Sequence, residues 1–151
     1  MPSSRVSSPN PSTMPDSPAL RQIALAHHVL DDSTAHFDLF LAPESPFKPT
    51  DRVIETWRLP ADPRELDVGA GFSIEPLPLH IGRDLLLEAP RRTMTRPGLL
   101  HPLARGVANV HSQATNLLVL NIIWQSGDPP IELQIDSALC RMDRSRMTAC
   151  K

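Results

Sequence analysis

Proline recurs along the whole chain, and this feature limits the possible folds more than any other. The 151 residues include 17 prolines but only 6 glycines. Each proline lacks a backbone N–H and fixes φ, so a chain with this spacing of prolines does not form long helices. The segments between the prolines are short and alternate apolar with polar residues, which is typical of strands. Together these features predict an all-β protein, a small antiparallel β-barrel.

The same pattern predicts the domain organisation. Residues 1–19 are rich in Ser and Pro and predict a disordered tail, because they lack the apolar residues of a core. Residues 20–136 are expected to form one β-barrel domain, with 91–136 as its atypical part. Residues 137–151 are expected to be a C-terminal tail, either a short helix or disordered.

Within the domain, alternation predicts several strands and the faces that they bury. Phe37, Leu39 and Leu41 fall on one face of the segment HFDLFLA, and His36, Asp38 and Phe40 on the other. Further strands are expected in RQIALAHHV, VIETWRL, NLLVLNIIWQ and PIELQID. Short extended segments are expected in FSIEPLPLH and DLLLEAP, and an irregular basic segment in RRTMTRPGLLHPLARG.

Charge and cysteine content exclude some classes of function. The formal net charge is −2. Residues 19–90 carry 12 acidic and 6 basic residues, a balance of −6, and residues 91–151 carry 8 basic and 4 acidic, a balance of +4. A surplus of +4 is too small to predict a nucleic-acid partner by itself. The only cysteines, Cys140 and Cys150, form neither a disulfide framework nor a zinc ribbon and suit free thiols in a reducing compartment.

No membrane segment is expected. The N-terminus lacks the apolar core of a signal peptide, and the longest apolar run, 117–124, is too short to span a bilayer. We therefore expect a cytoplasmic protein that does not contact a membrane.

Histidines and an aspartate concentrate in the stretch HHVLDDSTAHFD. His36 and Asp38 are two residues apart, so they project from the same face of a strand. His27 and His28 end the preceding strand, and hairpin pairing would bring one of them beside His36. Imidazole and carboxylate together bind Mn²⁺, Zn²⁺ or Fe²⁺. The pattern predicts a two-histidine, one-carboxylate metal site, although ordinary histidines in a loop and strand fit the same spacing.

Four segments in order extend this pattern to a known family. They are HHVLDDSTAHFDLFL, ETWRLP, EPLPLH and LLLEAP, and they carry His28, His36-Phe37-Asp38, Trp57, His80 and Glu88-Ala89-Pro90. Over about residues 20–90 they resemble the 3′-phosphoesterase domain of bacterial DNA ligase D, and especially its stand-alone relatives.

The resemblance implies a β-barrel with an Mn²⁺-dependent hydrolase site. Such domains remove 3′-phosphates and 3′-terminal ribonucleotides from DNA ends during repair, beside a DNA ligase or polymerase of end joining. His28, His36 and Asp38 would be the metal ligands, with His27 as an alternative to His28. His80 would contact the phosphate or act as a catalytic acid.

Three positions depart from the family pattern. The family has an arginine where this chain has Phe40, another where it has Phe72, and a tyrosine where it has Asp84. Two bidentate phosphate donors are thereby lost. Arg58 or Arg83 would have to bind the substrate in their place.

The resemblance ends at Pro90, and several interpretations remain open. The segment RRTMTRPGLL differs from the family through divergence or through a shifted reading frame near Arg91. Besides the enzyme, the chain fits a non-catalytic barrel that binds metal or nucleic acid, or a barrel whose second half leaves no functional site. Trp57 is expected in the core rather than as a platform for a base. His101 and His111 lie outside the motif.

Basic residues after Pro90 admit two interpretations. They either contact a DNA backbone or form a solvated loop. These residues are Arg91, Arg92, Arg96 and Arg105.

Overall fold

The computed structural model describes residues 20–94 and 96–147, and it confirms the all-β prediction. Over the described residues the strands are β1 (Leu20–Leu30), β2 (Ala35–Leu41), β3 (Arg52–Leu59), β4 (Gly71–Ser73), β5 (Glu75–Ile81), β6 (Arg91–Thr93), β7 (Gly98–Ala114), β8 (Leu117–Trp124), β9 (Ile131–Asp136) and β10 (Arg141–Ser145). A 3₁₀ helix, Pro63–Glu65, and a one-turn helix, α1 (Gly82–Leu85), are the helical segments of this part of the chain. The predicted disordered tail, residues 1–19, lies outside the described residues, as does Cys150.

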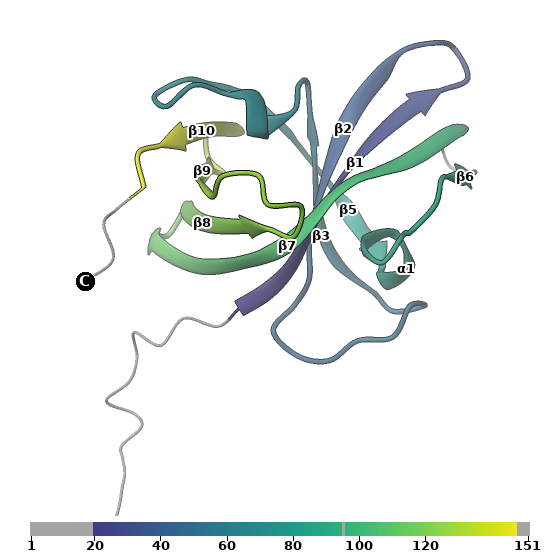
Figure 1. Cartoon of the computed structure of the whole chain (residues 1–151), viewed down its shortest axis with the longest axis horizontal. Coiled ribbons are helices and arrows are strands. Elements are labelled where there is room, and N and C mark those ends of the chain that lie inside the picture. Colours follow the sequence, from purple (N-terminus) through teal and green to yellow (C-terminus); the bar gives the residue numbers. More distant parts are fainter. Residues whose placement is uncertain (1–19, 95, 148–151) are drawn as a thin grey trace, which may run out of the picture.

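All the strands belong to one antiparallel sheet that curls almost into a barrel (Figure 1). The order of paired strands is β4-β10-β9-β8-β7-β1-β2-β3-β5, with β6 added beside β7. The two end strands are not paired with each other, so the sheet is not closed by hydrogen bonds. They are, however, consecutive in the chain and separated only by Ile74. One extended segment therefore pairs with β10 at its start and with β3 at its end, which brings the two edges together.

The longest strand, β7, begins in the segment 91–106, for which we expected irregular structure, and that expectation was wrong. Gly98 to Ala114 pairs with β1 along one part and with β8 along another. Figure 1 shows β7 crossing the molecule from the layer of β8 to the layer of β1 and β6. The reason for the wrong prediction is Pro102, since a proline within a segment normally argues against a strand. Pro102 is accommodated because the register shifts beside it, between Leu25 and Ala26 of β1, and a bulge tolerates a residue without an N–H.

Two shorter segments also differ from the prediction. DLLLEAP is not extended, because Asp84 and Leu85 belong to α1 and are buried against the sheet. The C-terminal tail is neither helical nor disordered up to Ser145, since β10 pairs with both β9 and β4. Met142, which is fully buried, is the only core residue of β10, so its alternation was too short to be recognised. The sheet therefore extends beyond the predicted boundary at residue 137.

Apolar side chains form two separate cores, one on each face of the β1–β2 hairpin. The interior core fills the curled sheet and includes Trp57, as expected for a buried tryptophan. The outer core lies under α1 on the opposite face and includes Phe40, Ile54 and Leu85. Alternation in β2 places Leu39 in the interior core and Phe40 in the outer one, which confirms the predicted faces.

Among the described residues, no helix is long enough and apolar enough to cross a membrane.

Candidate metal centre

The hairpin of β1 and β2 positions a cluster of two histidines and one aspartate. His28 is paired with His36 in the strand register, and Ala26 is paired with Asp38. Paired residues lie on the same face, and so do residues two apart, so all three side chains share the face of the outer core. All three are buried, and the side chain of Asp38 is only 3% exposed. The structure thus brings together the three residues predicted to bind metal.

Two of the three distances within the cluster match the spacing of ligands around one ion, and the third is slightly longer. His28 Nδ1 lies 3.2 Å from His36 Nε2, which lies 3.3 Å from Asp38 Oδ1. His28 Nδ1 lies 3.8 Å from Asp38 Oδ2. Two ligand atoms about 2.1 Å from a metal, at angles of about 90° to 110°, are about 3.0 to 3.4 Å apart. One divalent ion can therefore contact one atom of each residue after small side-chain adjustments.

One carboxylate oxygen of Asp38 accepts no hydrogen bond from the described residues. Its Oδ1 atom is buried and has no hydrogen-bond partner among the described residues, although His36 Nε2 is close. A buried, unpaired carboxylate oxygen costs free energy and is uncommon in folded proteins. A cation bound between the three side chains would satisfy this oxygen.

The electrostatic environment keeps His28 available as a ligand. Burial lowers the pKa of His28, and the neighbouring His36 lowers it further, while the Asp38 carboxylate partly opposes them. A lowered pKa favours the neutral imidazole, which has a lone pair for a metal. The ring is also held from outside the cluster, because His28 Nε2 lies 2.9 Å from Thr93 Oγ1.

The cluster lines a cavity of about 330 Å³ that is otherwise rich in arginine. The basic residues around it are Arg52, Arg58, Arg91 and Arg96. Arg58 lies opposite Asp38 in the register and donates from Nη1 to Glu75 at 2.9 Å. Arg91 forms an ion pair with the buried carboxylate of Asp84. The Nε atoms of Arg58 and Arg91 are both buried without a hydrogen-bond partner among the described residues.

His80 lines the same cavity from β5, beside the cluster rather than within it. Its Nδ1 lies 3.1 Å from the carbonyl oxygen of Pro78. A carbonyl only accepts, so Nδ1 carries the proton, and Nε2 is the atom free to exchange a proton or bind a ligand. The ring centroid lies 5.4 Å from that of Phe40, which fixes the ring from one side.

Not every sequence-predicted residue reaches the cavity. Arg83 is exposed on α1 and does not line it. His27 lies on the opposite face of β1 from His28, where its ring stacks on Phe37 with centroids 4.7 Å apart. His28 rather than His27 therefore belongs to the cluster. His101 is paired with His27 in the register, away from the cluster, and His111 is exposed.

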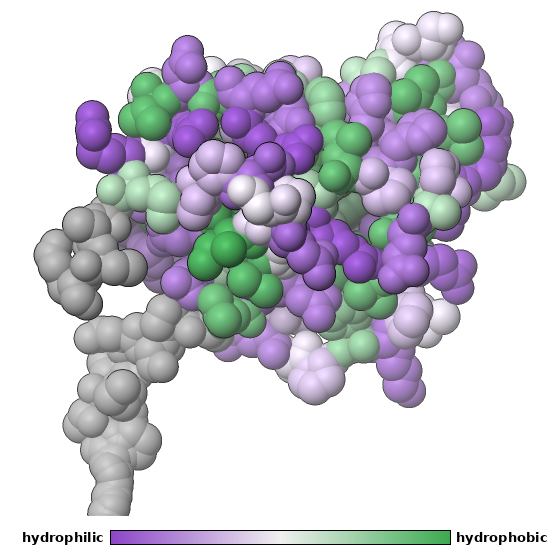
Figure 2. Space-filling model, in the orientation of Figure 1, coloured by the Kyte–Doolittle hydropathy of each residue, from purple (hydrophilic) through white to green (hydrophobic). Residues whose placement is uncertain are grey.

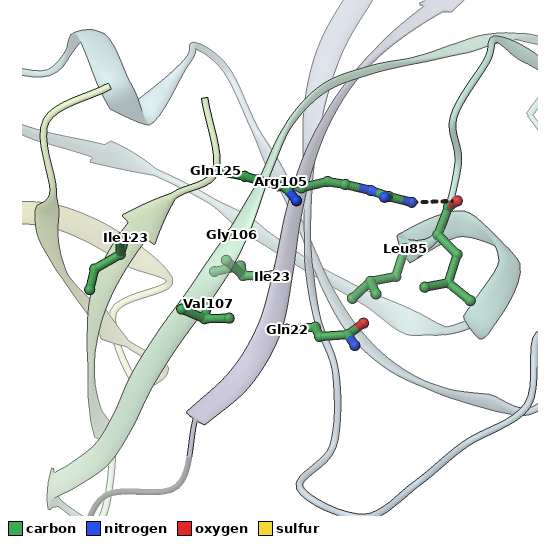
Figure 3. Close-up of a pocket in the computed structure, with 9 residues that line it drawn as sticks. Gln22, Ile23, Leu85, Arg105, Gly106, Val107, Ile123 and Gln125 are labelled. Carbon is green, nitrogen blue, oxygen red and sulfur yellow. Dashed lines mark hydrogen bonds between the residues drawn. The ribbon is translucent and has the colours of Figure 1, made fainter. Parts of the chain in front are cut away.

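The basic residues after Pro90 separate into different environments. Arg91 and Arg96 line the cavity of the cluster. Arg92 forms an ion pair with Asp31 at the tip of the hairpin. Arg105 donates to the carbonyl oxygen of Leu86 at 2.6 Å, across the second cavity drawn in Figure 3.

That second cavity has a volume of about 370 Å³, slightly more than the cavity beside the cluster, but it has fewer groups that could bind a metal. Its lining includes Gln22, Val107, Ile123 and Gln125, and no histidine, cysteine or carboxylate. Figure 2 shows apolar side chains gathered over β7 and β8, the strands that carry the exposed Val107 and Ile123. We place the functional site at the smaller cavity because the ligand-type atoms converge there.

Sequence reasoning missed two residues of the site. Thr93, in a segment predicted to be irregular, contacts His28, and Arg52 at the start of β3 lines the cavity. Both reach the site through the pairing of strands, which no local pattern in the sequence indicates.

Together the fold and the cluster define a class: an antiparallel β-sheet protein with a candidate metal centre of two histidines and one aspartate on its outer face. No protein-family model, no curated protein and no solved structure matches the chain.

Proposed function

We propose that the protein is a metal-dependent phosphoesterase that acts on the 3′ ends of DNA, with Mn²⁺ as the ion. The observation that carries the proposal is the convergence of His28, His36 and Asp38 in a cavity lined by arginines. Histidine and carboxylate ligands suit Mn²⁺ and similar divalent ions, and guanidinium groups suit phosphate. The resemblance of residues 20–90 to the 3′-phosphoesterase domain of DNA ligase D supports the same substrate.

The metal ligands leave room for a substrate. Three protein ligands would occupy only part of the coordination sphere of a divalent ion, and all three line the cavity that a substrate would enter. A bound ion would neutralise a phosphate oxygen and lower the pKa of a coordinated water. The protein contributes by burying the ligands and by holding His28 through Thr93.

Arg58 and Arg91 are our candidates for the phosphate donors that the family pattern lacks here. Phe40, at the position of one missing arginine, is fully buried in the outer core, and Phe72 packs against the interior core. Neither side chain lines the cavity or can donate a hydrogen bond to phosphate, so the donors must come from elsewhere. Arg58 and Arg91 line the cavity, and each has a buried Nε without a partner among the described residues. We propose that these N–H groups donate to the phosphate.

His80 is our candidate for the catalytic acid. Its Nδ1 proton is committed to the carbonyl of Pro78, so the proton given to the substrate would be a second one, carried on Nε2 of the doubly protonated ring. A histidine in this position can protonate the leaving oxygen of a phosphoester near neutral pH. Arg83, the other substrate-binding residue predicted from the sequence, is not included because it does not line the cavity.

The test uses a primer–template with a 3′-phosphate or a 3′-terminal ribonucleotide, with and without Mn²⁺. The matched variants are His28→Ala and His27→Ala, which remove neighbouring histidines from opposite faces of β1. We expect Mn²⁺-dependent trimming to a 3′-hydroxyl in the wild type and in His27→Ala, and loss of trimming in His28→Ala. Circular dichroism would establish that both variants are folded.

The outcome also separates the enzyme from the binding module. Mn²⁺ binding without trimming would refute catalysis and favour a non-catalytic barrel that binds metal or nucleic acid. Loss of trimming in His27→Ala but not in His28→Ala would refute the assigned ligands. Addition of a DNA ligase or polymerase of end joining to the wild-type reaction would test the proposed partners.

A further inference from the structure

The hydroxyl group of Thr93 makes three polar contacts. The number of protons available determines the direction of each hydrogen bond. Its Oγ1 lies 2.6 Å from the carbonyl oxygen of Arg96 and 3.3 Å from that of Gly98. It also lies 2.9 Å from His28 Nε2. A threonine hydroxyl has one proton to donate, and a carbonyl oxygen can only accept. The proton therefore goes to a carbonyl, of which Arg96 is the closer, and the hydroxyl oxygen must accept from His28.

This assignment determines the tautomer of His28. Since Nε2 donates to Thr93, the neutral ring carries its lone pair on Nδ1. Nδ1 is the atom that faces the cluster, at 3.2 Å from His36 Nε2 and 3.8 Å from Asp38 Oδ2. If Nδ1 carried the proton instead, the lone pair would be on Nε2, directed at a hydroxyl oxygen that has no proton left to offer.

We propose that Thr93 is a positioning residue of the metal centre, whose hydroxyl holds His28 in the Nε2–H tautomer so that Nδ1 is the coordinating atom. The inference rests on the proposed metal binding, but not on the identity of the substrate. Hydrogen bonds of this kind, from the far nitrogen of a histidine ligand, orient the ring, and their loss typically weakens metal affinity about 10- to 100-fold.

The main chain that fixes Thr93 comes from the half of the molecule beyond the family resemblance. Thr93 ends β6 and is paired with Gly98 of β7, and both carbonyls within reach of its hydroxyl belong to this turn and strand. The adjoining strand β7 also pairs with β1 at His28, through Leu100. The β6–β7 turn is thus attached to the same strand as the ligand that it orients, and residues after Pro90 contribute to the metal centre.

The closing experiment compares Thr93→Val, which keeps the shape but removes the hydroxyl, with Thr93→Ser, which keeps the hydroxyl. The first measurement is the ¹⁵N NMR spectrum of His28 in the metal-free wild type at pH 7.5, because tautomers differ in their nitrogen shifts. The second is the dissociation constant for Mn²⁺ by calorimetry, with the unfolding midpoint of each metal-free variant as the folding control.

We expect the Nε2–H tautomer in the wild type and in Thr93→Ser, and a mixture of tautomers in Thr93→Val. Affinity for Mn²⁺ should fall about 10- to 100-fold in Thr93→Val and stay within about threefold in Thr93→Ser. An Nδ1–H tautomer in the wild type would overturn the proposal even if Thr93→Val does not fold. Unchanged affinity for Mn²⁺ in a folded Thr93→Val would overturn the proposed role of Thr93 but not the proposed function. A wild type that binds no Mn²⁺ would overturn both.

Discussion

The two faces of the β1–β2 hairpin are both buried, but they are built for different purposes. On the interior face Ile23, Leu25 and Leu39 pack in an apolar core. On the outer face, small alanines and Phe40 continue directly into His28, His36 and Asp38. The outer face therefore changes from apolar core to polar cluster within one strand.

The difference shows how a small sheet can combine a stabilising apolar core with a buried polar cluster. Burial on the interior face stabilises the fold by about 25 cal/mol per Å² of apolar surface. Burial of the polar cluster on the outer face costs free energy, because a carboxylate and two imidazoles lose water without complete pairing.

The largest effect is expected on the interior face. Leu39→Ala should lower the free energy of unfolding by about 2 to 5 kcal/mol, because Leu39 is fully buried and truncation leaves a cavity. Urea denaturation in the presence of a chelator would measure this loss. The folded fraction should still bind Mn²⁺ with wild-type affinity, and a large loss of affinity would contradict the separation of the two faces.

In contrast to Leu39→Ala, Asp38→Asn should change the affinity for Mn²⁺ much more than the stability of the fold. The amide keeps the shape of the side chain but removes a buried charge whose Oδ1 is unpaired, so metal-free stability should change by less than about 1 kcal/mol. Affinity for Mn²⁺ should fall more than about tenfold, because a charged ligand is lost.

The thermal shift on adding Mn²⁺ provides the measurement. In the wild type, a metal concentration of about 100 times the dissociation constant stabilises the fold by about 2.7 kcal/mol, and Asp38→Asn at the same concentration should lose most of this gain. A metal-free Asp38→Asn destabilised by several kcal/mol would instead assign Asp38 to the structural framework.

The metal-free protein should lose stability as the pH falls below about 6.5, the ordinary pKa of histidine. Burial lowers the pKa of His28 in the folded state, so the unfolded chain binds the proton first. The loss continues until the pH reaches the lower pKa of the folded state. Urea denaturation between pH 5 and 7.5 should give a shallower slope for His28→Ala, and equal slopes would argue against a buried neutral His28.

The smallest effect is expected at the hairpin tip, outside both faces. The hydroxyl and the backbone N–H of Thr34 both donate to Asp32 Oδ1, at 2.6 and 2.9 Å, and these bonds lower the pKa of Asp32. Thr34→Ala keeps only the backbone bond, so the pKa of Asp32 should rise toward its ordinary value. NMR titration of the carboxyl carbon would detect the change, while the resonances of His28 and His36 should stay in place.

Much of the first half could be predicted from local patterns. Alternation in HFDLFLA placed Leu39 and Phe40 on opposite faces, and the structure confirms both. The spacing of His36 and Asp38, with a histidine at the end of the preceding strand, predicted a three-residue cluster. The structure brings His28, His36 and Asp38 together. Such predictions succeed because a hairpin relates neighbours in the chain to neighbours in space.

The second half could not be predicted as well, because its strands depend on partners that are distant in the chain. Because of Pro102, the sequence does not indicate that β7 is one continuous strand. The strand continues past the proline through a bulge against β1. β10 has a single core residue, and it is a strand only because β9 and β4 lie on either side of it. Arg83 was selected from its place in the sequence, but the one-turn helix leaves it exposed.

The sequence by itself determined that the chain is a β protein with a candidate two-histidine, one-carboxylate site, because proline spacing, alternation and hairpin proximity are local properties. Only the tertiary structure decided that His28 rather than His27 joins the cluster, since the strand register sets the face of each residue. It also decided that Arg58, Arg91 and Thr93 surround the site. These residues come from separate strands, and their approach depends on the curling of the whole sheet rather than on any short stretch of chain.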